Sequence, residues 1–88
     1  MICKEVEIIN KLGLHARPAT MLVKTAAKYK AKIKIKKDDL TVDAKSIMGV
    51  LILAAQKGTT LKIEVDGQDE AEAIEEVVAL FANGFGEE

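Results

Sequence analysis

The spacing of hydrophobic and polar residues along the chain predicts four β-strands. Hydrophobic residues alternate with polar ones in four short segments, and this two-residue period is typical of strands with one buried face. The first segment runs from Ile2 to Ile9, and the hydrophobic positions of the others are Ile33 and Ile35, Leu40 and Val42, and Leu61, Ile63 and Val65. Asp38-Asp39 separates the second segment from the third and predicts a hairpin.

Two further segments have the three-to-four-residue spacing of amphipathic helices. One begins at Ala16 and has Pro18 in its first turn, where the missing N–H group has no partner to lose. Its hydrophobic stripe comprises Ala19, Leu22, Val23 and Ala26. The other follows Asp69, which we expect to form a capping box with Glu72. Its stripe comprises Ile74, Val77, Val78 and Phe81, and Asn83-Gly84 ends it.

A third helix is predicted from Ile47 to about Ala55, with Ser46 as its N-cap residue. Hydrophobic side chains surround this helix almost completely; they are Ile47, Met48, Val50, Leu51, Ile52 and Leu53. One sheet covers only one side of a helix, so the others are either covered by a neighbouring helix or exposed as a docking patch. The pattern leaves both interpretations open. Met48 suits a patch, because its flexible thioether adapts to several partners.

The elements follow one another in the order β-α-β-β-α-β-α. Four strands with one hydrophobic face each need a cover, and amphipathic helices provide it on one side. We therefore predict an α+β fold in which helices cover one face of an antiparallel sheet and water covers the other. The chain has 88 residues, and we expect a single domain over residues 1–88.

Composition argues against nucleic acid as a partner. Aromatic residues make up only 3% of the chain, so few side chains are available to stack on bases; they are Tyr29, Phe81 and Phe85. Residues 24–37 contain many lysines and no acid, which leaves a nucleic-acid-binding domain as an alternative that salt-sensitive binding would support. However, lysine alternates with isoleucine over residues 32–36, as expected for the solvated face of a strand, and the net charge is −1.

Cys3 is the only cysteine, so it forms neither an internal disulfide nor a cysteine-based metal site, and we interpret it as a small hydrophobe of the first strand. The N-terminus lacks a basic start followed by an apolar run, so we expect no signal peptide. No stretch reaches the ~18 consecutive apolar residues of a membrane span, so we expect no membrane insertion. Together these features predict a cytoplasmic protein.

His15 is the only histidine, and its position favours a role with phosphate. It lies directly before the helix that begins at Ala16, and the first N–H groups of a helix have no partner within it. These groups and the helix dipole attract anions, and the guanidinium of Arg17 can pair with phosphate oxygens. Since Pro18 has no N–H group, Ala16 and Arg17 are the expected backbone donors.

An imidazole nucleophile beside such an anion site suits reversible phosphorylation on nitrogen. The plainer alternative is a surface or capping histidine. A metal site is not expected, because no second histidine and no cysteine cluster joins His15. A hydrolase is not expected either, because the motif offers no nucleophile with an orienting acid.

The segment Asn10-Lys-Leu-Gly-Leu-His15-Ala-Arg-Pro-Ala-Thr20 resembles the active-site signature of the HPr family. This family comprises the histidine-containing phosphocarriers of the bacterial phosphoenolpyruvate-dependent sugar phosphotransferase system. Chain length, element order and the segment Lys45–Val50 match it too, so the resemblance covers the whole chain. It implies an open-faced β-sandwich with a four-stranded antiparallel sheet and three helices on one face.

The resemblance also implies a function. Enzyme I would phosphorylate His15 on Nδ1, Arg17 would stabilise the phosphoryl group, and the group would pass to enzyme IIA domains in carbohydrate uptake. The protein would be a carrier without a cofactor and not an enzyme, and we expect it to be a monomer. The partner-binding face implied by the resemblance comprises Thr20, Lys24, Ile47, Met48 and Leu51.

The segment around Ser46 resembles a regulatory site of the same family in low-GC Gram-positive bacteria. There an ATP-dependent HPr kinase/phosphorylase modifies the serine, and the product acts with a catabolite control protein. An N-cap serine needs no such role, since capping alone is worth about 1 kcal/mol. Ser46 is therefore expected to cap the helix, and the resemblance implies that it is also a regulatory phosphorylation site.

Leu12 leaves the choice of phosphorelay open. Many sugar-system relatives have Thr or Ser at this position, and Asn-Lys-Leu-Gly also occurs in the nitrogen-related phosphotransferase branch. The segment Ser46-Ile47-Met48-Gly49 favours the carbohydrate branch. A regulatory module that docks transcription factors and carries no phosphate is a further alternative, which the presence of His15 disfavours.

Overall fold

The computed structural model describes residues 1–87 and confirms the predicted order of elements. The strands are β1 (Ile2–Glu7), β2 (Lys32–Lys37), β3 (Leu40–Asp43) and β4 (Thr60–Asp66), and the helices are α1 (Ala16–Ala27), α2 (Ile47–Ile52) and α3 (Glu70–Ala82). A short 3₁₀ turn, η1 (Gly84–Gly86), follows α3.

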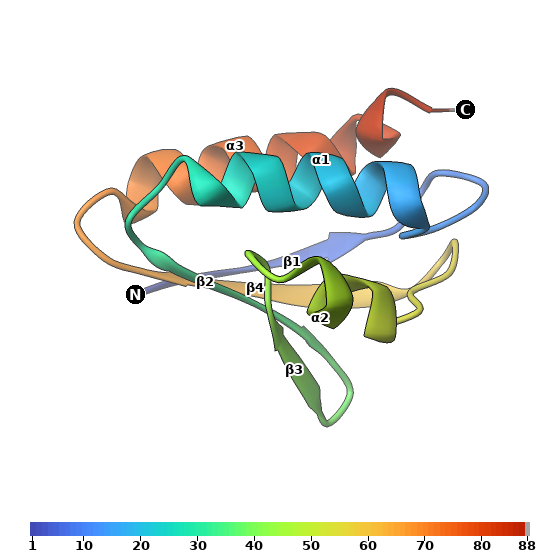
Figure 1. Cartoon of the computed structure of the whole chain (residues 1–88), viewed down its shortest axis with the longest axis horizontal. Coiled ribbons are helices and arrows are strands. Elements are labelled where there is room, and N and C mark those ends of the chain that lie inside the picture. Colours follow the sequence, from blue (N-terminus) through green and yellow to red (C-terminus); the bar gives the residue numbers. More distant parts are fainter. Residues whose placement is uncertain (88) are drawn as a thin grey trace.

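The strands form one sheet in the order β1-β4-β2-β3, and all neighbouring strands are antiparallel. The last strand, β4, therefore lies between the first two strands of the chain (Figure 1). In this register Ile63 of β4 is opposite Lys4 of β1 on one side and Ile35 of β2 on the other. The sheet thus places β4 in its interior, with β1 at one edge and β3 at the other.

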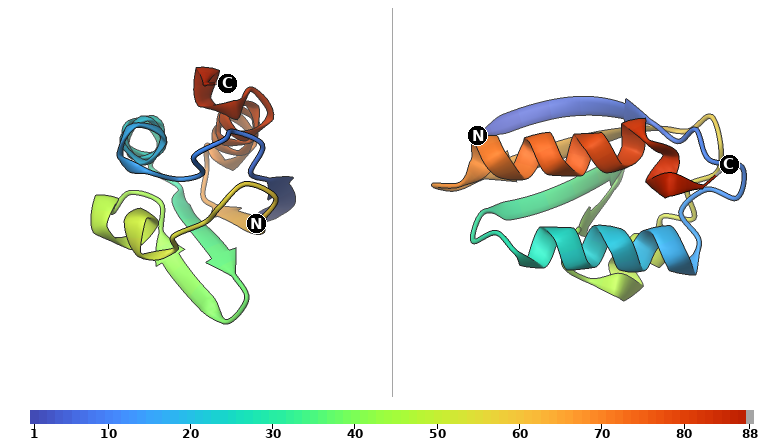
Figure 2. Two further views of the ribbon diagram at one scale, coloured as in Figure 1. Left: turned by 90° about the vertical axis from the view of Figure 1, so that its right-hand side faces the viewer. Right: turned by 90° about the horizontal axis from the view of Figure 1, so that it is seen from above.

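The helices cover one face of this sheet, as predicted. α1 and α3 lie side by side along it, and the opposite face is left open (Figures 1 and 2). α2 packs against α1 and β3. The arrangement is an α+β open-faced β-sandwich.

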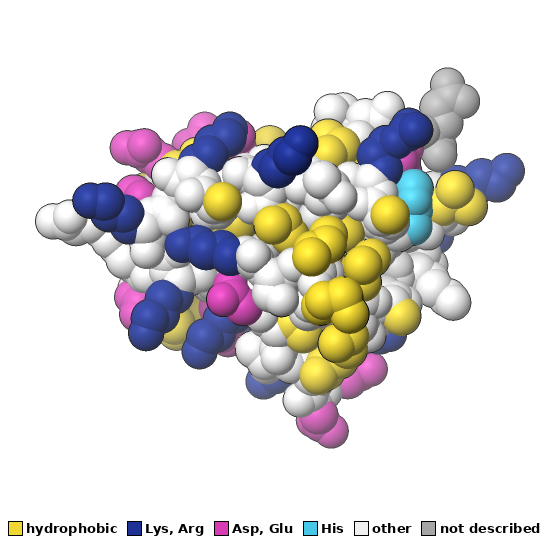
Figure 3. Space-filling view, in the orientation of Figure 1, with side chains coloured by type: hydrophobic (Ala, Val, Ile, Leu, Met, Phe, Trp, Pro, Cys, Tyr) yellow, Lys and Arg dark blue, Asp and Glu magenta, His cyan; other side chains and the backbone are white. Residues whose placement is uncertain are grey.

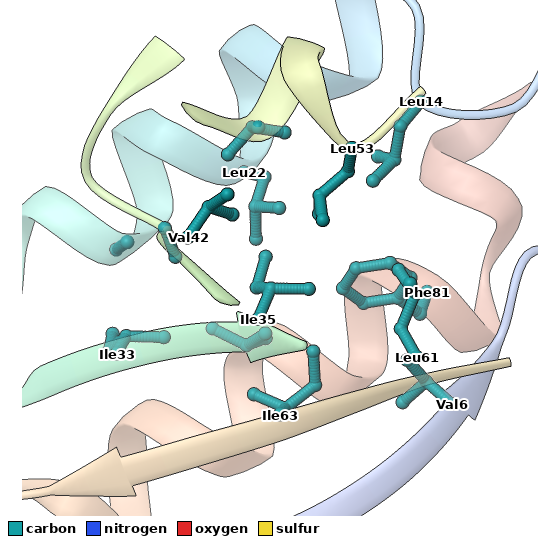
Figure 4. Packing of buried hydrophobic residues seen from close by; sticks show 14 of the residues in the cluster. Val6, Leu14, Leu22, Ile33, Ile35, Val42, Leu53, Leu61, Ile63 and Phe81 are labelled. Atoms are coloured by element: carbon teal, nitrogen blue, oxygen red, sulfur yellow. The ribbon is translucent and has the colours of Figure 1, made fainter. Parts of the chain in front are cut away.

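The hydrophobic core lies between the sheet and the helices (Figure 4). Ile33, Ile35 and Ile63 point into it from the sheet and are at most 1% exposed. Leu22 of α1 and Phe81 of α3 close it from above. The alternating lysines of β2, Lys32, Lys34 and Lys36, are exposed. This confirms that they form the outer face of a strand.

Two predicted element ends are wrong. β1 ends at Glu7 instead of Ile9, because Ile8 bonds to the loop before β4 and not to a strand: its N–H donates to the Thr59 carbonyl at 2.9 Å. α2 ends at Ile52 instead of Ala55. Ala54 has a φ of 48°, in the left-handed region, so the backbone leaves the helix there.

Two local interpretations are also corrected. The Asp69 side chain forms no cap hydrogen bond; its carboxylate instead accepts the N–H groups of Lys30 at 2.8 Å and Ala31 at 2.9 Å. The predicted capping box is therefore absent, and Asp69 ties the start of α3 to the start of β2. Cys3 lies in β1 but is exposed, opposite Glu64, so it is no part of the hydrophobic core.

Candidate functional site

His15 is the N-cap residue of α1, as predicted. Its backbone is extended, with φ −79° and ψ −169°, and its carbonyl accepts the Ala19 N–H at 3.0 Å. The imidazole forms no cap hydrogen bond, and the side chain is 35% exposed. The ring therefore lies at the start of the helix and within reach of a partner protein.

The loop before His15 is held by backbone contacts with the segment that follows α2. The Leu14 N–H donates to the Ala55 carbonyl at 2.9 Å, and the Leu14 side chain is buried. Gly13 has a φ of +70°, and a Cβ atom added to it would lie 2.3 Å from the Ala55 oxygen. Only glycine fits this close approach, which is how the loop brings His15 to its position.

The backbone at the start of α1 presents free donors beside His15. Within residues 1–87 the N–H groups of Ala16 and Arg17 donate to no carbonyl or side chain, and both residues are exposed. Pro18 is buried and contributes no N–H group. This geometry has the features of an anion-binding helix start with a guanidinium nearby.

A carboxylate that sequence reasoning missed completes the site. Glu87 Oε1 lies 3.0 Å from Nε2 of His15 and also accepts Nδ2 of Asn10 at 3.1 Å. The hydrogen bond with His15 lowers the pKa of Glu87 most, and the Asn10 hydrogen bond and the charge of Arg17 lower it further, against desolvation. Glu87 is 72 residues from His15 along the chain, so no local pattern indicates the contact.

Ser46 is the N-cap residue of α2, as predicted. Its hydroxyl oxygen accepts the Gly49 N–H at 3.1 Å, and the residue is exposed. The side chain therefore both caps the helix and faces water.

The α2 patch, defined here as Ile47, Met48, Leu51 and Ile52, is an exposed hydrophobic surface. Its members are 37–64% exposed, whereas Val50 of the same helix is fully buried. Of the two interpretations of this helix, the exposed patch is the one found. Figure 3 shows hydrophobic side chains extending across this face toward the single histidine. Thr20 and Lys24 are exposed on α1, the helix that packs against α2.

Residues 1–87 contain neither a metal-binding cluster nor a membrane-spanning helix. No group of three or more His, Cys, Asp or Glu side chains there is arranged to hold a metal ion. In the same range no helix has both the length and the apolar character to cross a membrane.

Comparison with known proteins agrees with this geometry. The family model described as PTS HPr component phosphorylation site matches residues 2–83. The phosphocarrier protein HPr of Neisseria meningitidis serogroup A is 47% identical over 87 residues, which cover 99% of this chain and 98% of that protein. The phosphocarrier protein NPr of Klebsiella oxytoca is 44% identical over 84 residues, 94% of this chain and 93% of that one.

The fold is that of solved HPr structures. The crystal structure of HPr-C-His from Thermoanaerobacter tengcongensis superposes with a TM-score of 0.96 and 46% identity, over 100% of this chain and 99% of that one. Sequence and structure thus agree over nearly the full length, and the chain belongs to the HPr family of phosphocarrier proteins.

Proposed function

We propose that this chain carries a phosphoryl group on His15 from enzyme I to an enzyme IIA domain in carbohydrate uptake, as a cytoplasmic monomer. The observation that carries the proposal is the position of His15: an accessible imidazole at the N-cap of α1, beside the free N–H groups of Ala16 and Arg17. Family membership supports it, since the matched family model is described by its phosphorylation site.

The transfer is a displacement at phosphorus. The Nδ1 lone pair of His15 attacks the phosphorus of the donor's phosphohistidine, and a new N–P bond forms. The old N–P bond breaks, and its electron pair returns to the donor's ring. The N–H groups of Ala16 and Arg17 and the Arg17 guanidinium hold the phosphoryl oxygens. Their binding has to be moderate, because stabilising the carried state too strongly would slow the onward step.

Partners dock on the face formed by the α2 patch with Thr20 and Lys24. The patch lies on the same face of the molecule as His15 (Figure 3). Successive partners have to use it in turn, which requires a small and readily released interface. Hydrophobic contact with Met48 and its neighbours provides the affinity, while the chemistry takes place at the edge of the contact.

Phosphorylation of Ser46 regulates this docking. A phosphate there adds a charge of about −1.5 to −2 beside the α2 patch. It lowers the affinity for enzyme I by repulsion and by the cost of desolvating the charge, without refolding the helix. The enzyme implied is an HPr kinase/phosphorylase, and a catabolite control protein would bind the product. Equal affinity of enzyme I for the wild type and Ser46→Asp would contradict this mechanism.

A carrier of the nitrogen-related branch is the second candidate. Leu12 and the 44% identity to a protein named NPr favour it. Leu12 is 70% exposed in the loop before His15, so it is available to distinguish partners. Parallel assays with the first enzyme of each branch separate the two functions, because the correct donor supports faster phosphorylation.

Intact-mass spectrometry tests the carrier function. The protein is incubated with enzyme I and phosphoenolpyruvate, and the wild type is expected to gain one phosphoryl group that is labile in acid. His15→Ala should gain none, and Arg17→Ala should be phosphorylated more slowly. A wild type without an adduct, beside a relative that is phosphorylated by the same enzyme, would reject the proposal and favour a regulatory module that carries no phosphate.

A further inference from the structure

We propose that Glu87 is a positioning residue that fixes the tautomer of His15 and thereby makes Nδ1 the attacking nitrogen. The inference deepens the carrier function proposed above and rests on it for its role in transfer. It gives the segment that follows α3 a role in the site, although this segment lies outside the sequence motif around His15.

The contact itself determines where the ring proton lies. Glu87 Oε1 is 3.0 Å from Nε2 of His15, and an ionised carboxylate only accepts hydrogen bonds. Nε2 therefore carries the hydrogen. In a neutral imidazole this leaves Nδ1 unprotonated, with its lone pair available to attack. The Glu87 carboxylate is in its ionised form near neutral pH, since its hydrogen bond with His15 holds its pKa below the usual value of a glutamate.

A buried amide holds the carboxylate in place. Asn10 is 2% exposed, and its Nδ2 donates to the Gly13 carbonyl at 2.8 Å and to Glu87 Oε1 at 3.1 Å. Both partners are acceptors, so the NH₂ group has to face them and the amide cannot be reversed without losing both bonds. Asn10 thus joins the loop that positions His15 to the carboxylate that contacts its ring.

The C-terminal segment is anchored so that Glu87 reaches this position. Phe85 is 2% exposed and packs edge to face on Phe81, with ring centroids 4.9 Å apart. Its φ of 57° turns the chain after α3 back toward His15, and the Glu87 N–H donates to the Gly84 carbonyl at 2.9 Å. Burying the phenyl ring of Phe85 at a strained backbone position ties residues 84–87 to the core.

The same contact stabilises the ring during transfer. When the N–P bond forms at Nδ1 and the donor's N–P bond breaks, the His15 ring keeps its Nε2 hydrogen and gains a formal positive charge. The carboxylate at Nε2 stabilises this charge, while Arg17 and the start of α1 act on the phosphoryl oxygens at the other nitrogen. Glu87 therefore stabilises the positive charge of the phosphorylated ring, and Arg17 stabilises the negative charge of its phosphoryl oxygens.

The test compares Glu87→Gln with Glu75→Gln, which removes the same charge from an exposed position of α3. Long-range ¹⁵N NMR spectra report which nitrogen of the neutral His15 ring is protonated, and they require no partner protein. We expect the Nε2–H tautomer in the wild type and in Glu75→Gln. We expect a mixture in Glu87→Gln, because an amide can either accept from Nε2–H or donate to a bare Nε2. Phosphorylation of Glu87→Gln by enzyme I should be roughly tenfold slower, the cost of one charge-assisted hydrogen bond.

The outcomes separate this inference from the carrier function. A wild type with the Nδ1–H tautomer, or a Glu87→Gln variant with an unchanged tautomer, overturns the inference even if the protein carries phosphate normally. A wild type with the Nε2–H tautomer that takes no phosphoryl group from an active enzyme I overturns the carrier function and leaves the tautomer assignment standing. Equal melting temperatures of Glu87→Gln and Glu75→Gln would show that a difference in tautomer or rate between them does not come from unfolding.

Discussion

The hydroxyl oxygen of Ser46 accepts the backbone N–H of Gly49 at 3.1 Å and closes the first turn of α2. α2 has only six residues, and an isolated helix of this length is unstable in water. The cap and the burial of Val50 therefore hold the helix that presents the hydrophobic patch. The oxygen proposed as the phosphorylation site is thus also the N-cap of the helix that presents the α2 patch.

Removing this cap is expected to destabilise the protein. Ser46→Ala should lower the free energy of unfolding by about 1 kcal/mol, because the Gly49 N–H loses its acceptor. Ser46→Asp keeps an acceptor at the N-cap and should remain close to wild type in stability. Urea denaturation at neutral pH measures both variants. Ser46→Ala with wild-type stability would show that the cap contributes nothing.

Position 13 requires glycine because its φ is positive and because a Cβ atom there would clash with a neighbouring backbone oxygen. Gly58 shares only the positive φ, so it serves as a control for backbone strain. Both have positive φ, +70° and +90°, but an added Cβ at Gly58 meets nothing within 4 Å, whereas at Gly13 it lies 2.3 Å from the Ala55 oxygen. Gly58→Ala should cost about 1–2 kcal/mol of stability from backbone strain alone. Gly13→Ala should cost roughly 2–5 kcal/mol, since overpacking adds to the strain.

Phosphorylation kinetics extend this comparison to the site. Gly13→Ala should also slow the transfer to His15, because the clash displaces the loop before the helix. Gly58→Ala should leave the rate unchanged. A Gly13→Ala variant that folds and accepts phosphate at the wild-type rate would contradict the role assigned to this close approach.

Hydrophobic side chains inside and outside the core should respond differently to truncation. Ile63 is 0% exposed, so Ile63→Ala should lower the free energy of unfolding by about 2–5 kcal/mol. Met48 is 64% exposed, so Met48→Ala should change stability by less than about 0.5 kcal/mol. The Met48→Ala variant should nevertheless bind enzyme I more weakly by about 1 kcal/mol, which is a roughly fivefold higher Kd.

Calorimetric titration with enzyme I measures that loss of affinity. Cys3→Ala is the control, because Cys3 is exposed in β1, away from α2. Unchanged binding by Met48→Ala, or an equal loss in both variants, would exclude the α2 patch as the docking surface.

Asp69 should make stability depend on pH in the acid range. The hydrogen bonds from the backbone N–H groups of Lys30 and Ala31 lower the pKa of this carboxyl below the usual value of an aspartate, against desolvation. Because the folded state favours the ionised form, the stabilisation is present above the unfolded pKa and is lost as pH falls through the folded one.

Thermal unfolding between pH 7 and pH 2 tests this dependence. Asp69→Asn should melt below the wild type at pH 7, and the difference should shrink as the pH falls below about 4. The control is Glu75→Gln, which removes an exposed carboxyl from α3. The difference in melting temperature between this variant and the wild type should not depend on pH in this way. A difference between Asp69→Asn and wild type that stays constant across the range would assign the effect to packing instead of charge.

The sequence by itself determined the local features of this protein. Alternating positions identified the strands, helical spacing identified α1 and α3, and local capping chemistry placed His15 and Ser46 at helix starts. These features depend on neighbours within a few residues, so they can be inferred from short patterns. The sequence motif also indicated the family, which the matched relatives confirmed.

Only the tertiary structure decided contacts between distant segments. Asp69 was expected to cap its own helix, but its carboxylate accepts N–H groups 38 and 39 residues away. The helix at Ile47 ends early at a backbone turn, and its uncovered side could be recognised only once α1 and the sheet were in place. The Glu87 carboxylate reaches His15 across 72 residues. Such partners depend on how the chain packs as a whole, because a polar group satisfies its hydrogen bonds with whichever atoms folding brings near it.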